Sequence, residues 1–229
     1  MLPDGLINTD IQPETGWSYE LGGRGRLLKG TVRYSLSAYY MDVRNLLVAR
    51  RTSADEFIGI NAGKAGLLGM EFSIDYDLVR SEAVTLGHHS AFSWNDHTFK
   101  EFEDGDRDYS GNELPGVPDL TVHSQLYLNS RCGWYGYLTY YAAGRMPITD
   151  DNSVFSDAYQ LLHLKAGYVK NVNKHWKFDI YAGVNNIFDE KYASMLQINA
   201  GSFGNNAPRY YYPGEPVNFY SGCNISYSF

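Results

Sequence analysis

The last eleven residues, Phe219-Tyr220-Ser221-Gly222-Cys223-Asn224-Ile225-Ser226-Tyr227-Ser228-Phe229, alternate in polarity up to the final aromatic side chain. Most odd positions are apolar, whereas the even positions from Gly222 onward are small or polar. Side chains of a β-strand point alternately to opposite faces, so this segment predicts a strand with one apolar face. A final strand with lipid on one side and water on the other is typical of a bacterial outer-membrane β-barrel.

The composition of the 229-residue chain agrees with this prediction and excludes several other classes. Aromatic residues make up 15%, led by 20 Tyr, whose apolar ring and polar hydroxyl suit a membrane interface. The mean hydropathy of −0.37 excludes a helical membrane protein, and a net charge of −7 argues against nucleic acid as a partner. Cys132 and Cys223 make no disulfide framework. The N-terminus lacks a secretory signal, so an outer-membrane protein with this sequence is expected to be a piece of a longer one.

The same two-residue alternation recurs along the whole chain, and no convincing helix interrupts it. Nine stretches show it, at about residues 15–27, 31–50, 57–79, 83–102, 120–129, 133–145, 159–169, 175–195 and 217–229. Their connections alternate between short ones (28–30, 80–82, 130–132 and 170–174) and long polar ones (51–56, 103–118, 146–157 and 197–216). Short periplasmic turns and long extracellular loops are the asymmetry of outer-membrane barrels. The prediction is an all-β, antiparallel, up-and-down transmembrane barrel, of which this chain is a part.

The direction in which the apolar stripes point separates this fold from a soluble one. In a membrane barrel, apolar side chains such as Phe72, Ile74, Phe178 and Ile180 face hydrocarbon, and the polar residues between them line a hydrated bore. In a soluble antiparallel sandwich the same stripes meet in a dry core. Stretches of about 20 residues exceed the usual length of soluble strands, which favours the membrane barrel.

Four segments, taken together, resemble a known family. Residues 184–193 (Val-Asn-Asn-Ile-Phe-Asp-Glu-Lys-Tyr-Ala) are similar to the Asn-Leu-Phe-Asp-x-x-Tyr signature of TonB-dependent outer-membrane receptors, with Ile187 in place of Leu. Residues 13–22 resemble the Pro-Glu-x-x-x-x-x-Glu-x-Gly strand of these receptors, and 114–118 (Leu-Pro-Gly-Val-Pro) their entry from loop to strand. Phe229 matches their terminal aromatic residue. The four segments occur in the family's order over almost the whole chain.

The resemblance implies a 22-stranded barrel filled by an N-terminal plug, which meets TonB in the periplasm and gates the import of scarce ligands such as iron–siderophore complexes. Residues 1–229 would then be the C-terminal part of the barrel domain, without the plug, the TonB box and about thirteen strands. An odd number of strands with open edges in lipid is expected neither to transport nor to be stable alone. The expected location is the outer membrane of a Gram-negative bacterium.

Charged residues on the polar side of the stretches are predicted to form the bore wall and to face the plug, with ligand contact as the alternative. Cross-strand pairs such as Arg33 with Glu71 are expected to offset the cost of their desolvation. The residues assigned to this wall are Arg24, Arg33, Glu71, Asp75, Lys177 and Asp179.

The candidate ligand contacts lie in the long loops. Arg209, Tyr210 and Tyr211 combine a cation with aromatic rings, which suits an anionic, planar ligand such as a catecholate or hydroxamate siderophore. The alternative for these residues is an interfacial aromatic girdle. Arg145 and Tyr141, at the outer end of the sixth stretch, are a second choice.

The sequence suggests no enzyme. Ser90 and His88 share one face, but no acid is identifiable that would orient the histidine, and no metal-ligand spacing or phosphate-binding glycine loop occurs. No cofactor is expected, since an iron–siderophore would be the transported ligand. Expected partners are outer-membrane lipid, TonB through the plug, a small metal chelate, and the barrel-assembly machinery, which would bind Tyr227 and Phe229. Two other functions stay open: a passive porin or adhesin-like barrel, and a soluble glycan-binding sandwich.

Overall fold

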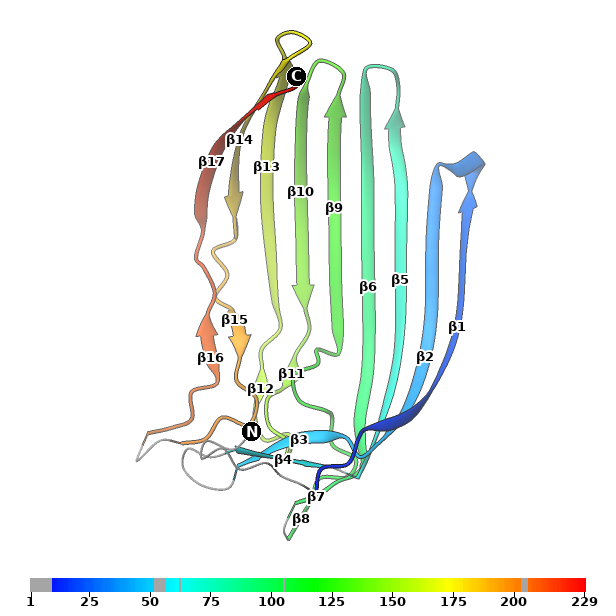
Figure 1. Cartoon of the computed structure of the whole chain (residues 1–229), viewed down its shortest axis with the longest axis vertical. Helices are drawn as coiled ribbons and strands as arrows, with labels where there is room; N and C mark the ends of the chain where they lie inside the picture. Colours follow the sequence, from blue (N-terminus) through cyan, green and yellow to red (C-terminus); the bar gives the residue numbers. More distant parts are fainter. Residues whose placement is uncertain (1–9, 52–56, 62, 105, 203–205) are drawn as a thin grey trace.

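The computed structural model describes residues 10–51, 57–61, 63–104, 106–202 and 206–229, and over these the chain is almost entirely antiparallel β-structure. One sheet holds nine strands in the order β1-β2-β5-β6-β9-β10-β13-β14-β17, so each strand pairs with the next one along the chain (Figure 1). The strands of this sheet are β1 (Thr15–Leu27), β2 (Val32–Arg44), β5 (Lys64–Arg80), β6 (Val84–Glu101), β9 (Leu120–Ser130), β10 (Trp134–Ala143), β13 (Tyr159–Asn171), β14 (Trp176–Asn185) and β17 (Asn218–Tyr227). The up-and-down topology is confirmed. In the described part of the chain, no helix is long and apolar enough to cross a membrane.

The two ends of the sheet differ, as the loop lengths predicted. Short turns, one of them the 3-10 turn η1 (Leu28–Gly30), lie at one end with the C-terminus; we call it the turn end (Figure 1). Every long connection carries a small hairpin at the opposite end, the loop end. The hairpins are β3 (Leu47–Arg51) with β4 (Phe57–Asn61), β7 (Glu103–Asp104) with β8 (Arg107–Asp108), β11 (Met146–Pro147) with β12 (Phe155–Ser156), and β15 (Ala193–Leu196) with β16 (Tyr211–Pro213).

Three of the predicted stretches were too long, because the main sheet ends earlier at the loop end. β2 stops at Arg44 and β14 at Asn185, and β5 begins only at Lys64. The residues that follow β2 and β14, Asn45 and Asn186, have φ values of +56° and +50°. This left-handed conformation breaks a strand, and asparagine tolerates it better than most residues.

The apolar stripes lie on one face of the sheet, here called the apolar face, and they remain exposed. Phe72 stacks against Phe92 at 6.0 Å between ring centroids, whereas Ile180 is 60% and Phe219 78% exposed. In the described residues, the largest fully buried side chains are instead Phe99, Pro147, Ile148 and Asn186. The stripes therefore do not meet in a dry core between strands, and the arrangement expected of a membrane barrel is confirmed.

The opposite face is here called the polar face. On it, the side chains of several tyrosines lie over glycines of the neighbouring strand. In five pairs of directly opposite residues, a Cβ added to the glycine would fall 2.2–2.4 Å from the tyrosine ring or hydroxyl. The pairs are Tyr39–Gly69, Tyr127–Gly87, Tyr135–Gly167, Tyr181–Gly222 and Tyr220–Gly183. Cross-strand aromatic contacts of this kind fix the register of a sheet that has no core.

A small apolar cluster at the loop end anchors the long loops. Phe99 and Phe102, 1% and 2% exposed, pack with ring centroids 4.8 Å apart. Partly buried apolar residues from the loops surround them: Leu46, Val48, Ile60, Tyr109 and Leu114. This cluster joins the end of β6 to the β3–β4 hairpin, so the loops are packed structures.

Replacing Gly133 by alanine is predicted to destabilise the β9–β10 turn. Gly133 has a φ of +106°, and a Cβ there would lie 2.1 Å from the carbonyl oxygen of Val169. We expect a loss of about 1–3 kcal/mol of unfolding free energy, measured as a lower urea midpoint of the complete protein in detergent. Gly23→Ala is the matched control, since nothing lies within 4 Å of a Cβ at Gly23. Equal midpoints for the two variants would contradict this account of the turn.

Candidate functional site

Three tyrosines from separate segments meet at the loop end. The ring centroid of Tyr141 in β10 lies 6.0 Å from that of Tyr159 at the start of β13. Tyr159 also stacks on Tyr192, with 5.1 Å between the ring centroids and 27° between the ring planes. Tyr159, Tyr192 and Tyr211 line an open pocket of about 380 Å³, which we call the tyrosine pocket. The remaining lining residues include Lys191 and Asp157. The pocket thus offers aromatic faces for stacking and an exposed ammonium group beside them.

The Asn-Ile-Phe-Asp-x-x-Tyr signature is what holds Tyr192 in this pocket. Asn186, 2% exposed, donates from its amide to the carbonyl oxygens of Glu190 (2.9 Å) and Glu215 (3.0 Å). Its amide oxygen accepts from the backbone N–H of Glu190 at 2.9 Å. The ring of Tyr192 then covers Gly214, where a Cβ would lie 2.3 Å from it. The signature therefore fastens the chain leaving β14 to the chain entering β17.

A second pocket at the loop end is acidic. It measures about 280 Å³ and is lined by Asp104, Asp150, Asp151, Arg107 and Tyr210, among others. Asn199 bridges two loops there: its amide donates to Asp150 Oδ2 at 2.9 Å, and its oxygen accepts from the Asp150 N–H at 3.0 Å. Burial raises the pKa of Asp150; the hydrogen bond from Asn199 lowers it, and the charges of Asp104 and Asp151 raise it further. The net effect is a raised pKa.

The five predicted ligand contacts do not form one site. Tyr211 lines the tyrosine pocket and Tyr141 adjoins it, but Tyr210 lines the acidic pocket. Arg145 donates to Glu113 at 3.0 Å and lies 4.6 Å from the ring centroid of Phe155. Arg209 is exposed, and within the described part of the chain its guanidinium group makes no hydrogen bond or ion pair. A ligand role for these five residues stays a prediction.

Sequence reasoning missed three residues of the tyrosine pocket: Tyr159, Lys191 and Tyr192. Two of them lie within the family signature itself, so the signal was present in the sequence. It was interpreted as a sign of the family, not as part of a site.

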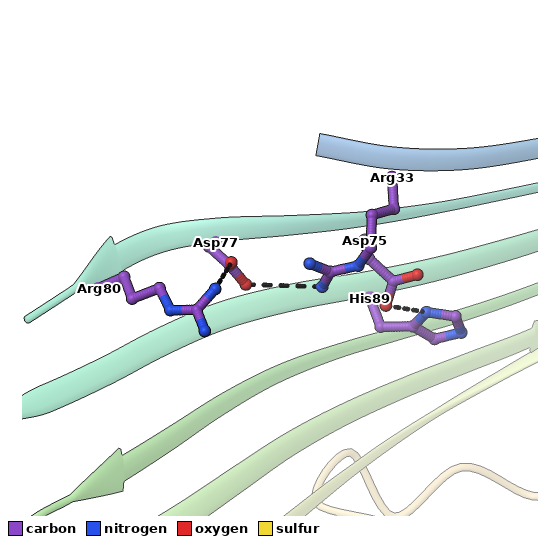
Figure 2. A network of polar contacts seen from close by, with 5 residues as sticks. All are labelled: Arg33, Asp75, Asp77, Arg80 and His89. Carbon is purple, nitrogen blue, oxygen red and sulfur yellow. Dashed lines mark hydrogen bonds and ion pairs between the residues drawn. The ribbon is translucent and has the colours of Figure 1, made fainter. Parts of the chain in front are cut away.

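All six predicted wall residues lie on the polar face, but their pairing differs from the prediction. Arg33 does not pair with Glu71, which lies opposite Ser37. Instead Arg33 contacts Asp77 at 3.6 Å, and Asp77 also contacts Arg80 at 3.3 Å (Figure 2). The reason is the stagger of the strands, which places Asp75 directly opposite Arg33.

Two further wall carboxylates have neutral or histidine partners. Asp75 is bonded to His89 Nδ1 at 3.0 Å (Figure 2). Asp179 accepts hydrogen bonds from the hydroxyl of Tyr135 (2.8 Å) and the amide of Asn224 (3.4 Å). Beside Glu71, the polar face is hollowed by about 310 Å³ over small side chains such as Ser35, Ser73 and Ser93. This face can therefore admit water or packed polypeptide, and it holds Asp75, Asp77 and Asp179 in fixed contacts.

The terminal aromatic residues gather at the turn end. The ring of Tyr227 lies 4.9 Å from Trp176 and 5.2 Å from Phe229, whose side chain is fully exposed. Their contact with the assembly machinery stays a prediction. Among the described residues, no group of three or more His, Cys, Asp or Glu side chains could hold a metal ion.

Asn186→Ala is predicted to loosen the loop between β14 and β17. The substitution leaves two carbonyls and one N–H without their partner, each costing about 1–3 kcal/mol where buried. We expect faster proteolysis within residues 197–216 of the complete protein. Asn129→Ala, at an exposed position of β9, should leave the cleavage rate unchanged. If both variants are cleaved at the wild-type rate, the signature does not lock the loop.

The loop packing around Asp150 is predicted to weaken as the pH rises above the ordinary range of an aspartate. Because the folded pKa is raised, the packed loops bind this proton more tightly than the unpacked ones. Stability is therefore highest below the ordinary pKa and falls as the pH passes through the raised one. The decrease of loop stability with pH should be measurable as a pH-dependent loss of protection from hydrogen exchange in residues 197–202. Asp150→Asn should abolish this pH dependence, which we call the slope. Asp106→Asn, at an exposed position, serves as control and should keep the slope. A slope retained in Asp150→Asn would assign it to another group.

Comparisons with known proteins agree with this geometry. The chain matches the family model described as TonB dependent receptor-like, beta-barrel, over residues 3–187. The ferric-pyoverdine 358 receptor of Pseudomonas putida is 26% identical over an alignment of 217 residues, and the match covers 89% of this chain and 24% of that protein. The siderophore receptor PiuA of Acinetobacter baumannii has a TM-score of 0.71 at 15% identity, and the match covers 97% of this chain and 30% of PiuA. The ferric-catecholate import receptor Fiu of E. coli has a TM-score of 0.67 at 18% identity, and the match covers 96% of this chain and 28% of the receptor.

At these identities the solved structures establish the fold alone: the nine strands follow the wall of a large outer-membrane barrel. The chain spans about a quarter of the length of the relatives it matches. In such a barrel the apolar face contacts the lipid of a Gram-negative outer membrane, and the polar face lines the bore. Since the family model covers most of the chain, the chain belongs to the TonB-dependent receptor-like β-barrel family.

Proposed function

We propose that this chain is the C-terminal wall of a barrel that imports a ferric siderophore across the outer membrane in a ligand-gated, energy-coupled manner. The observation that carries the proposal is the tyrosine pocket, which opens at the loop end where the barrel would meet the outside medium. The relatives are named as receptors for ferric pyoverdine, siderophores and ferric catecholates, which supports this class of ligand.

The chemistry of the pocket suits such a ligand. The stacked rings of Tyr159 and Tyr192 offer flat faces to the aromatic or delocalised groups that chelate iron. The exposed ammonium group of Lys191 favours a ligand with negative charge. Tyr211 donates to the carbonyl oxygen of Phe155 at 3.3 Å, which holds its ring at the edge of the pocket.

The rest of the transport cycle lies outside this chain in the proposal. A plug would fill the bore and reach TonB, which would supply the energy, while Tyr227 and Phe229 would be bound by the assembly machinery during insertion. A passive pore with the same wall would differ in one respect, because its uptake would not need TonB.

The complete receptor in its parent bacterium tests the proposal, with ferric pyoverdine and ferric enterobactin as probes. Uptake of an accepted chelate should fall to background when the receptor or TonB is removed. Tyr192→Leu should raise the Kd for the accepted ferric chelate roughly 2- to 10-fold, which corresponds to the loss of one aromatic contact. Tyr192→Phe keeps the ring and should leave this Kd near the wild-type value. Tyr19→Leu, an exposed position on the apolar face, is the control. Uptake that persists without TonB would identify a passive pore, and an unchanged Kd in Tyr192→Leu would remove the pocket from the site.

A further inference from the structure

Three exposed cations gather at the turn end of the sheet, on the inner strands between β9 and β14 (Figure 1). They are Arg131 in the β9–β10 turn, Lys170 near the end of β13, and Lys174 in the β13–β14 turn. Lys170 is on the apolar face, because it lies directly opposite Phe178 of β14. The β9–β10 turn lies against the same end of β13, since the N–H of Val169 donates to the carbonyl oxygen of Gly133 at 2.9 Å.

No counter-charge accompanies these cations in the part of the chain that the structure describes. None of the three side chains makes an ion pair or a hydrogen bond there. From residue 120 to residue 178 the only carboxylates in the sequence are Asp150, Asp151 and Asp157, and all three lie at the loop end. Asp179 is on the polar face, where it accepts a hydrogen bond from Tyr135, and Glu82 of the β5–β6 turn forms no ion pair with a described residue. This end of the sheet is therefore positive, although the whole chain has a net charge of −7.

Aromatic rings on the apolar face show the level at which the cations lie. The exposed Trp134 packs against Tyr168, with 5.0 Å between the ring centroids. The exposed Trp176 packs against Tyr227 in the same way, at 4.9 Å. Tryptophan and tyrosine collect at the boundary between the hydrocarbon and the headgroups of a bilayer. Because Lys170 follows Tyr168 by two residues toward the turn, its ammonium group reaches the level of the headgroup phosphates.

A groove of about 470 Å³ lies on the same face, deeper in the hydrocarbon region. Its floor is a row of small residues that lie directly opposite one another on β13, β14 and β17: Ala166, Ala182 and Ser221. Leu164, Val184 and Phe219 border it on the side of the loop end. Ala166 is four residues from Lys170 along β13, which is about 13 Å at about 3.3 Å per residue. Half of the hydrocarbon core measures about 15 Å, so a lipid whose phosphate is at Lys170 can place an acyl chain in this groove.

We propose that this part of the apolar face binds one anionic phospholipid of the periplasmic leaflet, with its phosphate among the three cations and an acyl chain in the groove. The proposal rests on the fold of the family, in which short turns are periplasmic, and not on siderophore import. The uncompensated positive charge selects an anionic headgroup, such as that of phosphatidylglycerol, over a zwitterionic one. The groove identifies the ligand as a lipid, because a free phosphate ion makes no contact with an apolar floor.

Binding of phosphatidylglycerol to the complete receptor in detergent, measured by native mass spectrometry, tests the headgroup site. Lys170→Gln should raise the Kd of the first bound phosphatidylglycerol roughly fivefold, which is the contribution of one cation beside anionic lipid. The preference for phosphatidylglycerol over phosphatidylethanolamine should fall with it. Lys29→Gln is the matched control, because it removes an exposed lysine of η1, at the same end but away from the groove, and it should leave the Kd unchanged. A wild-type Kd in Lys170→Gln, or equal binding of the two lipids to the wild-type receptor, overturns the headgroup site.

Ala182→Leu tests the groove without changing a charge. A larger side chain on the floor should raise the Kd of phosphatidylglycerol roughly 4- to 15-fold, which corresponds to the loss of one or two buried methylene groups. Ala38→Leu, at an exposed position on the apolar face of β2, is the matched control and should bind the lipid as the wild type does. An unchanged Kd in Ala182→Leu, or displacement of the lipid by an equal concentration of glycerol phosphate, overturns the acyl-chain site. A preference for lipopolysaccharide over phosphatidylglycerol overturns the assignment to the periplasmic leaflet.

Discussion

Every backbone N–H and C=O group in a lipid environment must find its partner inside the protein, and this constraint shapes the whole chain. The nine-stranded ladder satisfies it between β1 and β17, since each inner strand is bonded on both sides. It also removes the need for a core between layers. Side chains such as Phe219 and Ile180 can remain 78% and 60% exposed, because hydrocarbon and not water covers them. In water the same face would be an aggregation surface.

A sheet without a core needs other sources of rigidity, and these determine where the site is. The tyrosine–glycine pairs fix the register within the wall. At the loop end, three local sets of contacts hold the loops in place: the Phe99–Phe102 cluster, the hydrogen bonds of the buried Asn186, and the hydrogen bonds between Asp150 and Asn199. Of the three, Asn186 lies nearest the site, because its bonds to Glu190 and Glu215 hold the segment that carries Tyr192, which stacks on Tyr159. The tyrosine pocket is thus a product of the loop packing rather than of the barrel.

The sequence was sufficient for whatever depends on neighbours along the chain. Strand alternation is local, so the nine strands, their two faces and the inward position of Glu71 or Lys177 could be predicted. Partners across strands could not be predicted: the stagger, which places Arg33 opposite Asp75 and away from Glu71, is set by turn geometry, and the alternation within a strand does not contain it. The contact of Tyr159 with Tyr192 depends on the left-handed turn at Asn186 and on the hydrogen bonds that hold it. Such contacts between distant loops leave no periodic pattern in a single sequence.

The two loop-end pockets differ in charge, and this has a consequence for the proposed function. Asp104, Asp150 and Asp151 line the acidic pocket together with Tyr210, and Arg107 is the only basic residue among its described lining residues, so this pocket repels an anionic chelate. Among the described residues that line the tyrosine pocket, Lys191 is accompanied by a single carboxylate, Asp157. Charges in clefts act over a Debye length of about 8 Å at physiological salt, which is enough to bias a ligand between neighbouring sites. An anionic ferric chelate would therefore be directed past Tyr210 toward Tyr159 and Tyr192, beside the bore wall that carries Tyr141.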